Sequence, residues 1–119
     1  MEGVRFIATL PTVTTPVERL LYRLDLEQGA TDEASTTWHG EAGENALNLS
    51  NRLFGGIVVA QTIVAAGRTH ADRDLHSVQQ VFLRGGNASD PLHYRVERLF
   101  TGRTYALVRV EVHQGDHII

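Results

Sequence analysis

The fold is decided by residues 52–68, which read RLFGGIVVAQTIVAAGR. A helix with this sequence is apolar around its whole circumference, which predicts a helix enclosed by other structure rather than a surface helix with one apolar stripe. The run begins at Gly55 and Gly56 and closes at Gly67 and Arg68, a pair that is typical of a helix C-terminus. It is shorter than the roughly 20 apolar residues that cross a bilayer, so no membrane span is predicted.

The sequence before this helix predicts an arm, a short helix and a long connection. Residues 1–15 are expected to form a loosely attached N-terminal arm. Thr15 resembles a helix N-cap, and residues 16–24 carry apolar side chains at helical spacing. Residues 29–50 are polar, and only the stretch 36–39 has the composition of a short strand. Long ordered connections of this kind are often functional.

Strand-like sequence follows the apolar helix. Residues 75–84 are a strand candidate, alternation of apolar and polar residues predicts strands over 92–97 and 106–112, and residues 117–119 begin another. Turns join these segments, which indicates an antiparallel sheet. A strand of three residues is near the lower limit, so we expect the sheet to be completed by further polypeptide. The predicted class is α+β, with residues 16–119 forming one domain around the buried helix.

Composition excludes several functions. The net charge of −3 over 119 residues provides no basic field for nucleic acid. The chain has no cysteine, which removes disulfides and thiolate chemistry, and we expect a cytoplasmic protein because no signal peptide is evident. All 11 basic residues are arginine, so Schiff-base chemistry is excluded. The 6 histidines lack a metal-ligand spacing, and neither a metal nor an organic cofactor is expected.

Four separate motifs occur in an order and spacing that point to a known family. They are Phe54-Gly55-Gly56 with Val58-Val59-Ala60-Gln61, then Ala65-Ala66-Gly67-Arg68, then Leu75-His76-Ser77 with Phe82-Leu83-Arg84-Gly85-Gly86, and finally Tyr94-Arg95-Val96-Glu97-Arg98-Leu99 with Gly102-Arg103-Thr104-Tyr105. This series resembles the first hotdog domain of acyl-CoA thioesterase II, the TesB type. The resemblance covers about residues 16–119.

The resemblance implies a fold and an activity. The fold is a hotdog, in which a curled antiparallel sheet wraps around one central helix. The activity is hydrolysis of a fatty acyl-CoA thioester to the free fatty acid and coenzyme A. Members of the family carry a second hotdog, so the implied partner is a second hotdog domain or chain, and a homo-oligomer is expected. The family's catalytic aspartate, hydroxyl residue and glutamine lie in that second half, and no catalytic residue is assigned to this chain.

Candidate substrate-binding residues are Gly55, Gly56, Ile57 and Arg84. The two glycines would present helix N–H groups to a thioester carbonyl or an anion, or alternatively allow close packing of the helix on the sheet. Ile57 stands where the family usually has glutamine. Arg84 would hold a phosphate of coenzyme A or form a salt bridge at a strand end. Inside the helix, a structural hydrogen bond is the favoured role of Gln61.

Two other functions are compatible with these residues. The first is a non-catalytic hotdog that binds acyl chains or serves as an assembly domain, which the loss of glutamine at Ile57 favours. The second is a hotdog hydratase acting on enoyl-CoA, although the characteristic loop with a histidine and a carboxylate is absent from the sequence. Glu97 and Glu111 are predicted to lie on the strand face opposite the apolar side chains, which leaves no well-placed general base in this chain.

Overall fold

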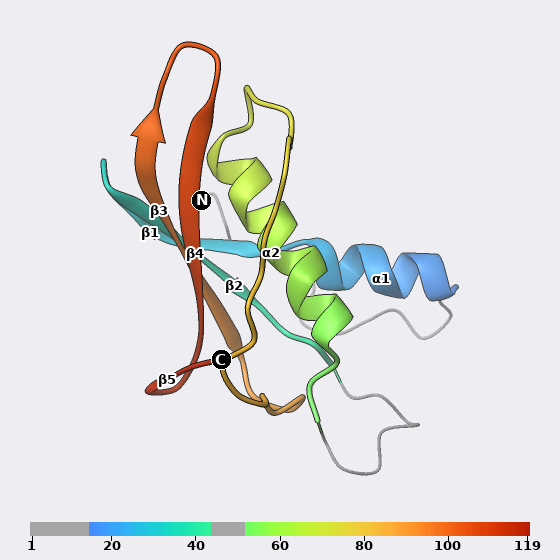
Figure 1. The fold of residues 1–119 in the computed structure, drawn as a ribbon. Coiled ribbons are helices and arrows are strands. Elements are labelled where there is room, and N and C mark those ends of the chain that lie inside the picture. Colours follow the sequence, from blue (N-terminus) through green and yellow to red (C-terminus); the bar gives the residue numbers. More distant parts are fainter. Residues whose placement is uncertain (1–14, 44–51) are drawn as a thin grey trace.

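The computed structural model describes residues 15–43 and 52–119. The arm predicted over residues 1–15 therefore lies outside the described residues except for Thr15. The elements are α1 (Pro16–Leu24), β1 (Glu27–Thr31), β2 (Ser35–Gly40), α2 (Gly55–Thr69), β3 (Leu92–Thr101), β4 (Ala106–Gln114) and β5 (His117–Ile118). They form one antiparallel sheet in the order β1-β2-β3-β4-β5, with α2 against one face (Figure 1).

Helix α1 confirms the prediction over residues 16–24. The Thr15 side chain accepts a hydrogen bond from the Glu18 N–H, and the Glu18 carboxylate accepts one from the Thr15 N–H, which is a capping box. The apolar side chains of this helix are not covered, since Val17, Leu20 and Leu21 are 64%, 47% and 60% exposed. Figure 1 shows α1 running outward from the sheet and across the direction of α2.

Strand β1 was missed by the sequence prediction, which treated residues 29–50 as a connection containing one short strand over 36–39. The segment Glu27–Thr31 is polar and contains a glycine, so its intrinsic strand propensity is low. It becomes a strand because its backbone pairs with β2, with Glu27 opposite His39 and Gln28 opposite Trp38. Tertiary pairing overrides local propensity here.

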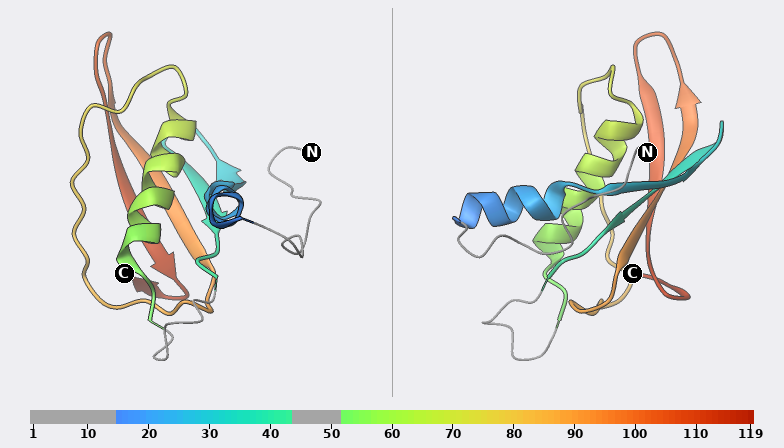
Figure 2. Two further views of the ribbon diagram at one scale, coloured as in Figure 1. Left: turned by 90° about the vertical axis from the view of Figure 1, so that its right-hand side faces the viewer. Right: turned by 180° about the vertical axis from the view of Figure 1, so that it is seen from behind.

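Helix α2 lies across the concave face of the sheet (Figure 2). Its buried side chains are Val58, Gln61, Thr62 and Ala65, which form one side of the helix. They contact a core that includes Trp38, Leu92, Tyr94, Val96 and Val112 from the sheet. The prediction that the whole circumference is enclosed is wrong for the described residues, because the rest of α2 is half-buried or exposed. The helix also continues past Gly67 and ends at Thr69. No described helix has the length and apolarity to cross a membrane.

Residues 75–84 do not form the predicted strand. They run as extended chain past the β4 side of α2 (Figure 2). Within the described residues, their backbone hydrogen bonds are those from the N–H groups of Leu83 and Arg84 to the Ile119 carbonyl. A strand needs backbone hydrogen bonds to a neighbouring strand along its length, and this segment has such bonds only at its end. Its apolar side chains remain uncovered, since Leu75, Val81 and Leu83 are 58%, 68% and 66% exposed.

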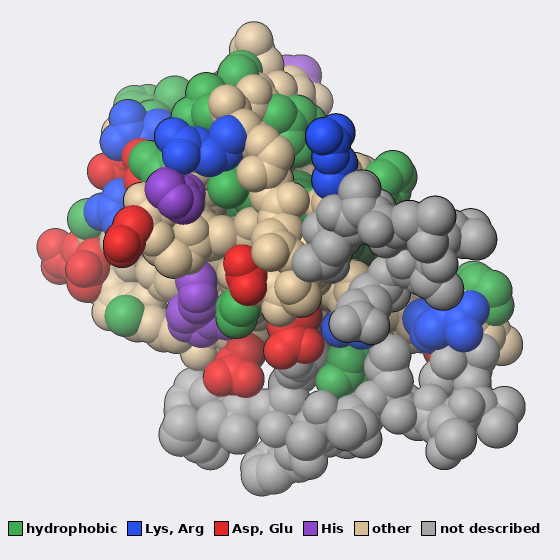
Figure 3. All heavy atoms as spheres, turned by 90° about the horizontal axis from the view of Figure 1, so that it is seen from below, with side chains coloured by type: hydrophobic (Ala, Val, Ile, Leu, Met, Phe, Trp, Pro, Cys, Tyr) green, Lys and Arg blue, Asp and Glu red, His purple; other side chains and the backbone are tan. Residues whose placement is uncertain are grey.

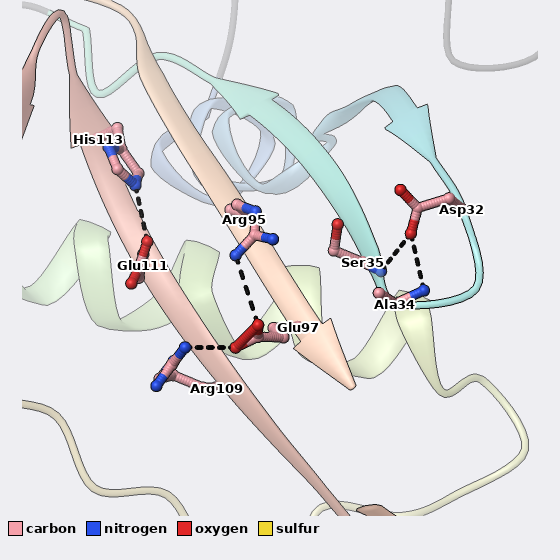
Figure 4. Close-up of polar contacts among 8 residues, drawn as sticks. All are labelled: Asp32, Ala34, Ser35, Arg95, Glu97, Arg109, Glu111 and His113. Atoms are coloured by element: carbon pink, nitrogen blue, oxygen red, sulfur yellow. Dashed lines mark hydrogen bonds and ion pairs between the residues drawn. The ribbon is translucent and has the colours of Figure 1, made fainter. Parts of the chain in front are cut away.

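Charged side chains on β3 and β4 lie on the face of the sheet away from α2, as predicted for Glu97 and Glu111 (Figure 4). The Glu97 carboxylate pairs with Arg95 and Arg109, and the Glu111 carboxylate lies 3.2 Å from Nε2 of His113. In the turn between β1 and β2, backbone N–H groups of Ser35 and Ala34 donate to Asp32 and hold the pKa of that carboxyl below its usual value.

Three histidines form one row on this outer face. His93 on β3 is opposite His39 of β2 on one side and His113 of β4 on the other. Nδ1 of His39 and Nδ1 of His93 are 2.6 Å apart, so this contact holds one proton and is lost when both rings are fully protonated. Burial lowers the pKa of His93, and the neighbouring charges of His39 and His113 lower it further.

This lowered pKa predicts that the protein loses stability in mild acid. Below the pKa of an unfolded histidine, about 6.5, the unfolded chain binds more protons at this position than the folded chain does. The contribution of His93 to the free energy of unfolding should therefore be fully present above that pH and be lost as the pH drops through it. Urea unfolding at a series of pH values tests this. His93→Gln should flatten the pH dependence, and a variant slope equal to that of the wild type would contradict the assignment.

Candidate functional site

A pocket of about 350 Å³ lies at the N-terminal end of α2. Its walls come from three places: the start of α2, the end of the extended segment 75–84 with the glycines that follow it, and the last residue of the chain. The lining residues are Leu53, Gly55, Val58, Phe82, Leu83, Arg84, Gly85, Gly86 and Ile119. Apolar side chains dominate, and among the described lining residues the one ionisable side chain is that of Arg84. Such a pocket suits an apolar ligand that carries an anionic or carbonyl group.

Gly55 places the first N–H groups of α2 at this pocket. The N-cap residue Phe54 has an extended backbone, and its side chain forms no capping hydrogen bond. No acidic residue is present in the first turn. The first backbone N–H groups of a helix lack intrahelical partners and carry the positive end of the helix dipole. A Cβ atom added to Gly55 would lie 3.3 Å from Cζ of Phe82, so glycine keeps this part of the pocket open.

The other two helix candidates do not line the pocket. Gly56 is exposed, and a Cβ atom added there would lie 2.5 Å from the ring of Phe54 rather than against the sheet. The packing role predicted for this glycine, close contact between helix and sheet, is therefore not what the structure shows. Ile57 is half-buried against the core. Gly55 and Arg84 are the two predicted residues that the fold brings together.

Arg84 sits at the end of the extended segment. Nη1 of Arg84 lies 2.9 Å from Nδ1 of His117 on β5. Within residues 15–43 and 52–119, no carboxylate forms an ion pair with Arg84, so the strand-end salt bridge considered from the sequence is not observed among the described residues. The Arg84 backbone is fixed by its N–H, which donates to the Ile119 carbonyl at 3.3 Å.

Sequence reasoning missed the apolar wall of the pocket. Phe82 faces Gly55, and Ile119 is buried with its N–H donating to the Val112 carbonyl. Residues 81–83 are an unbroken apolar run, and nothing local in the sequence shows that this run lies against the start of α2. Leu53 was quoted only as part of the apolar run; it lines the pocket because it immediately precedes the helix.

The described part of the pocket lacks a proton acceptor for catalysis. No aspartate, glutamate or histidine is among its lining residues. Glu97 and Glu111 lie on the far face of the sheet, as Figure 4 shows. Across residues 15–43 and 52–119, no group of three or more histidine, aspartate or glutamate side chains could hold a metal ion. The arrangement can bind and polarise a carbonyl group, but it does not contain a general base.

Gln61 has the structural role favoured from the sequence. Its side-chain amide donates to the carbonyl oxygens of Arg23 and Glu41, at 2.8 and 3.1 Å, and accepts from the Tyr94 hydroxyl. The residue is fully buried. It therefore ties α2 to the end of α1, to the residue after β2 and to β3.

Solved structures share this fold. The tesB protein of Mycobacterium avium subspecies paratuberculosis superposes with a TM-score of 0.72 and 35% sequence identity, over 85% of this chain and 38% of that chain. The TT0310 protein of Thermus thermophilus superposes with a TM-score of 0.70 and 21% identity, over 85% of this chain and 89% of that chain. The architecture is the hotdog fold expected from the sequence.

Sequence comparisons give the family. Acyl-coenzyme A thioesterase 8 of Mus musculus is 38% identical over 71 residues, which are 59% of this chain and 22% of the mouse protein. Acyl-CoA thioesterase 2 of Haemophilus influenzae is 39% identical over 69 residues, which are 57% of this chain and 24% of that protein. The chain thus spans less than a quarter of the length of these relatives. The family model described as acyl-CoA thioesterase N-terminal domain matches residues 46–119, more than half of the chain. The chain belongs to the acyl-CoA thioesterase N-terminal domain family.

Proposed function

We propose that the polypeptide carrying this chain hydrolyses fatty acyl-CoA thioesters to free fatty acid and coenzyme A. The observation that carries the proposal is the pocket at the start of α2, found in a chain of this family. It combines apolar walls for an acyl or pantetheine chain with the N-terminal N–H groups of α2 and with Arg84. Backbone N–H groups in such a position stabilise the negative charge that develops on a thioester oxygen during attack by water.

The water-activating group belongs, in this proposal, to a second hotdog domain or chain. Two observations support this division. No carboxylate lines the described pocket, and the chain spans 22–24% of the length of the relatives named above. Residues 16–119 would then be the N-terminal half of a double hotdog whose sheet is completed by further strands. The uncovered apolar side chains of residues 75–84 provide a surface for that packing.

The same uncovered surface leads us to expect association. Apolar side chains on residues 75–84 favour contact with another hotdog, in the same polypeptide or in a second copy. A homo-oligomer in the cytoplasm, acting in fatty acid metabolism, is the arrangement we propose. Light scattering of the complete polypeptide measures its assembly, and a stable monomer would contradict the oligomer.

A thiol-release assay on the complete polypeptide tests the activity. We expect release of free coenzyme A from acyl-CoA thioesters, measured with short, medium and long acyl chains. Tight binding of acyl-CoA without release of thiol would contradict hydrolysis and identify a non-catalytic acyl-binding domain. Hydration of an enoyl-CoA substrate, followed as loss of its conjugated absorbance without thiol release, would identify the hydratase instead.

Gly55→Val is predicted to weaken substrate binding more than it weakens folding. The branched side chain would extend into the pocket toward Phe82, beside the N–H groups of the first turn. We expect KM for acyl-CoA to rise about tenfold, with a change in the free energy of unfolding below about 1 kcal/mol. Gly67→Val is the matched control, because a Cβ atom at Gly67 meets nothing within 4 Å. Equal KM values for the two variants would remove Gly55 from the binding site.

A further inference from the structure

Arg84 is one of several described arginines that form no ion pair with a described carboxylate, and its side-chain partner is an imidazole. Carboxylate oxygens lie within 4.0 Å of the side chains of Arg23, Arg68, Arg73, Arg95 and Arg109. Arg84 has no such pair among the described residues, and Nη1 contacts Nδ1 of His117 instead. Its charge at the pocket is therefore not neutralised by a neighbouring carboxylate.

The contact determines which nitrogen donates and which accepts. Arginine has only donors, so Nη1 of Arg84 donates and Nδ1 of His117 accepts. The proton of the neutral imidazole is then on Nε2, which is a second donor. After this contact, the pair still offers the other N–H groups of the guanidinium and the Nε2–H of His117. A pair that presents only donors, with a full positive charge, matches a phosphate oxygen.

Backbone hydrogen bonds connect the two segments that carry Arg84 and His117. Leu83 and Arg84 donate to the Ile119 carbonyl at 2.8 and 3.3 Å, and the Ile119 N–H donates to the Val112 carbonyl at 2.9 Å. His117, two residues before Ile119, is opposite Gln114 in the β4–β5 pairing. Both residues are thus attached to backbone segments that are hydrogen-bonded to each other. A Cβ atom added at Gly85 meets nothing within 4 Å, so open space adjoins Arg84.

We propose that Arg84 and His117 form an anion clamp at the mouth of the Gly55 pocket, which binds a phosphate group of coenzyme A. Arg84 is the binding residue and His117 is the positioning residue that directs the guanidinium. This inference rests on the proposed function, and it adds to it both His117 and the part of the substrate that is recognised. The apolar pocket then receives the pantetheine and acyl portion, whose thioester would reach the N–H groups at the start of α2.

Charged side chains of both signs are mixed on the lower end of the molecule. Figure 3 views the molecule from below, the end at which β5 and the C-terminus lie, and shows acidic, basic and histidine side chains interspersed. No broad basic field would concentrate anions here, in keeping with the net charge of −3. Binding therefore depends on the charge-assisted hydrogen bonds of this one pair, and a single substitution should remove most of the effect.

Calorimetric binding of coenzyme A to the complete polypeptide tests Arg84 without requiring turnover. We expect Arg84→Gln to raise Kd about tenfold, the loss typical of a charge-assisted contact to phosphate. Arg103→Gln is the matched control, since Arg103 is an exposed arginine in the β3–β4 turn and does not line the pocket. An Arg84→Gln variant that binds like the wild type, or like Arg103→Gln, would overturn the clamp.

Three ligands show which phosphate is held. Coenzyme A carries a pyrophosphate and a 3′-phosphate, dephospho-coenzyme A carries the pyrophosphate alone, and pantetheine carries neither. An Arg84 effect present with the first two ligands assigns the clamp to the pyrophosphate. An effect confined to coenzyme A assigns it to the 3′-phosphate. An equal effect with pantetheine would overturn phosphate recognition altogether.

His117 is tested by a pair of variants that differ in their ability to accept a hydrogen bond from Arg84. Glutamine keeps a side-chain oxygen that can accept from Arg84, whereas phenylalanine keeps a planar aromatic ring and removes the acceptor. His117→Phe should weaken coenzyme A binding several-fold, and His117→Gln should restore part of the loss. Equal loss in both variants, or none, would remove His117 from the clamp.

The clamp and the proposed function can fail separately. Binding of coenzyme A that depends on Arg84 and His117, in a polypeptide that releases no thiol, would support the clamp and overturn thioester hydrolysis. Hydrolysis of acyl-CoA with KM independent of both side chains would support the function and overturn the clamp.

Discussion

The isolated 119-residue chain should release coenzyme A from acyl-CoA at a rate at least about a thousandfold below that of the complete polypeptide, because positioned acid–base groups contribute roughly 10²–10⁴-fold. The reason is the position of the carboxylates. A general base must lie within about 2.6–3.2 Å of the water that it activates. No carboxylate lines the described pocket. On the opposite face of the sheet, Glu97 pairs with Arg95 and Arg109, and Glu111 contacts Nε2 of His113.

The measurement is thiol release by the purified chain and by the complete polypeptide at equal concentration, with circular dichroism to verify that the chain is folded. Coenzyme A binding to the isolated chain distinguishes an incomplete site from an absent one, since the N–H groups of α2 and Arg84 remain. Turnover that persists in the isolated chain and falls in Glu97→Gln or Glu111→Gln would show that the chemistry resides on the sheet face instead.

The sequence predicted the elements whose information is local. The N-cap residue Thr15 marks the start of α1, and the period-2 pattern marks β3 and β4. The same alternation placed Glu97 and Glu111 on the outer face. Each of these features depends on residues a few positions apart, so a local pattern is sufficient.

Features that depend on a distant partner were predicted less well. Strand β1 forms from a polar segment because β2 lies beside it, whereas residues 75–84 have strand-like composition and remain unpaired along most of their length. The extent of burial around α2 likewise depends on which segments cover the helix. A prediction from its apolar sequence alone overestimated that burial.

The candidate site shows the same division. Gly55 and Arg84 were identified separately, from a helix start and from a motif, and the sequence did not show that they line one pocket. His117 was not assigned to the site, because its contact with Arg84 joins residues 33 positions apart. Motifs identify residue types, and the fold decides which of them meet.

Gln61→Leu should destabilise the protein by about 3 kcal/mol, near 1 kcal/mol for each buried hydrogen bond that is lost. The amide of Gln61 has three partners, which are the Tyr94 hydroxyl and the carbonyl oxygens of Arg23 and Glu41. Leucine has a similar volume, so the variant leaves these groups without their partner and creates little cavity. The Arg23 carbonyl loses its donor without a replacement, because it lies in the last turn of α1, where carbonyl oxygens lack intrahelical partners.

Tyr94 supplies the second half of the test. Its hydroxyl is buried, which raises its pKa far above the neutral range, so it stays a donor under all conditions of the experiment. Tyr94→Phe alone should cost about 1–2 kcal/mol, because it leaves the Gln61 oxygen without its donor. In the double variant the loss should be smaller than the sum of the single losses, since removing both partners leaves neither of these two atoms unsatisfied.

Urea denaturation of the four proteins gives the coupling free energy between Gln61 and Tyr94. Gln79→Leu is the matched control, because it makes the same chemical change at an exposed position and should alter the free energy of unfolding by less than about 0.5 kcal/mol. Strictly additive losses would mean that the two side chains do not interact. A Gln61→Leu variant as stable as the control would show that α1, α2 and β3 are held together by apolar contacts alone.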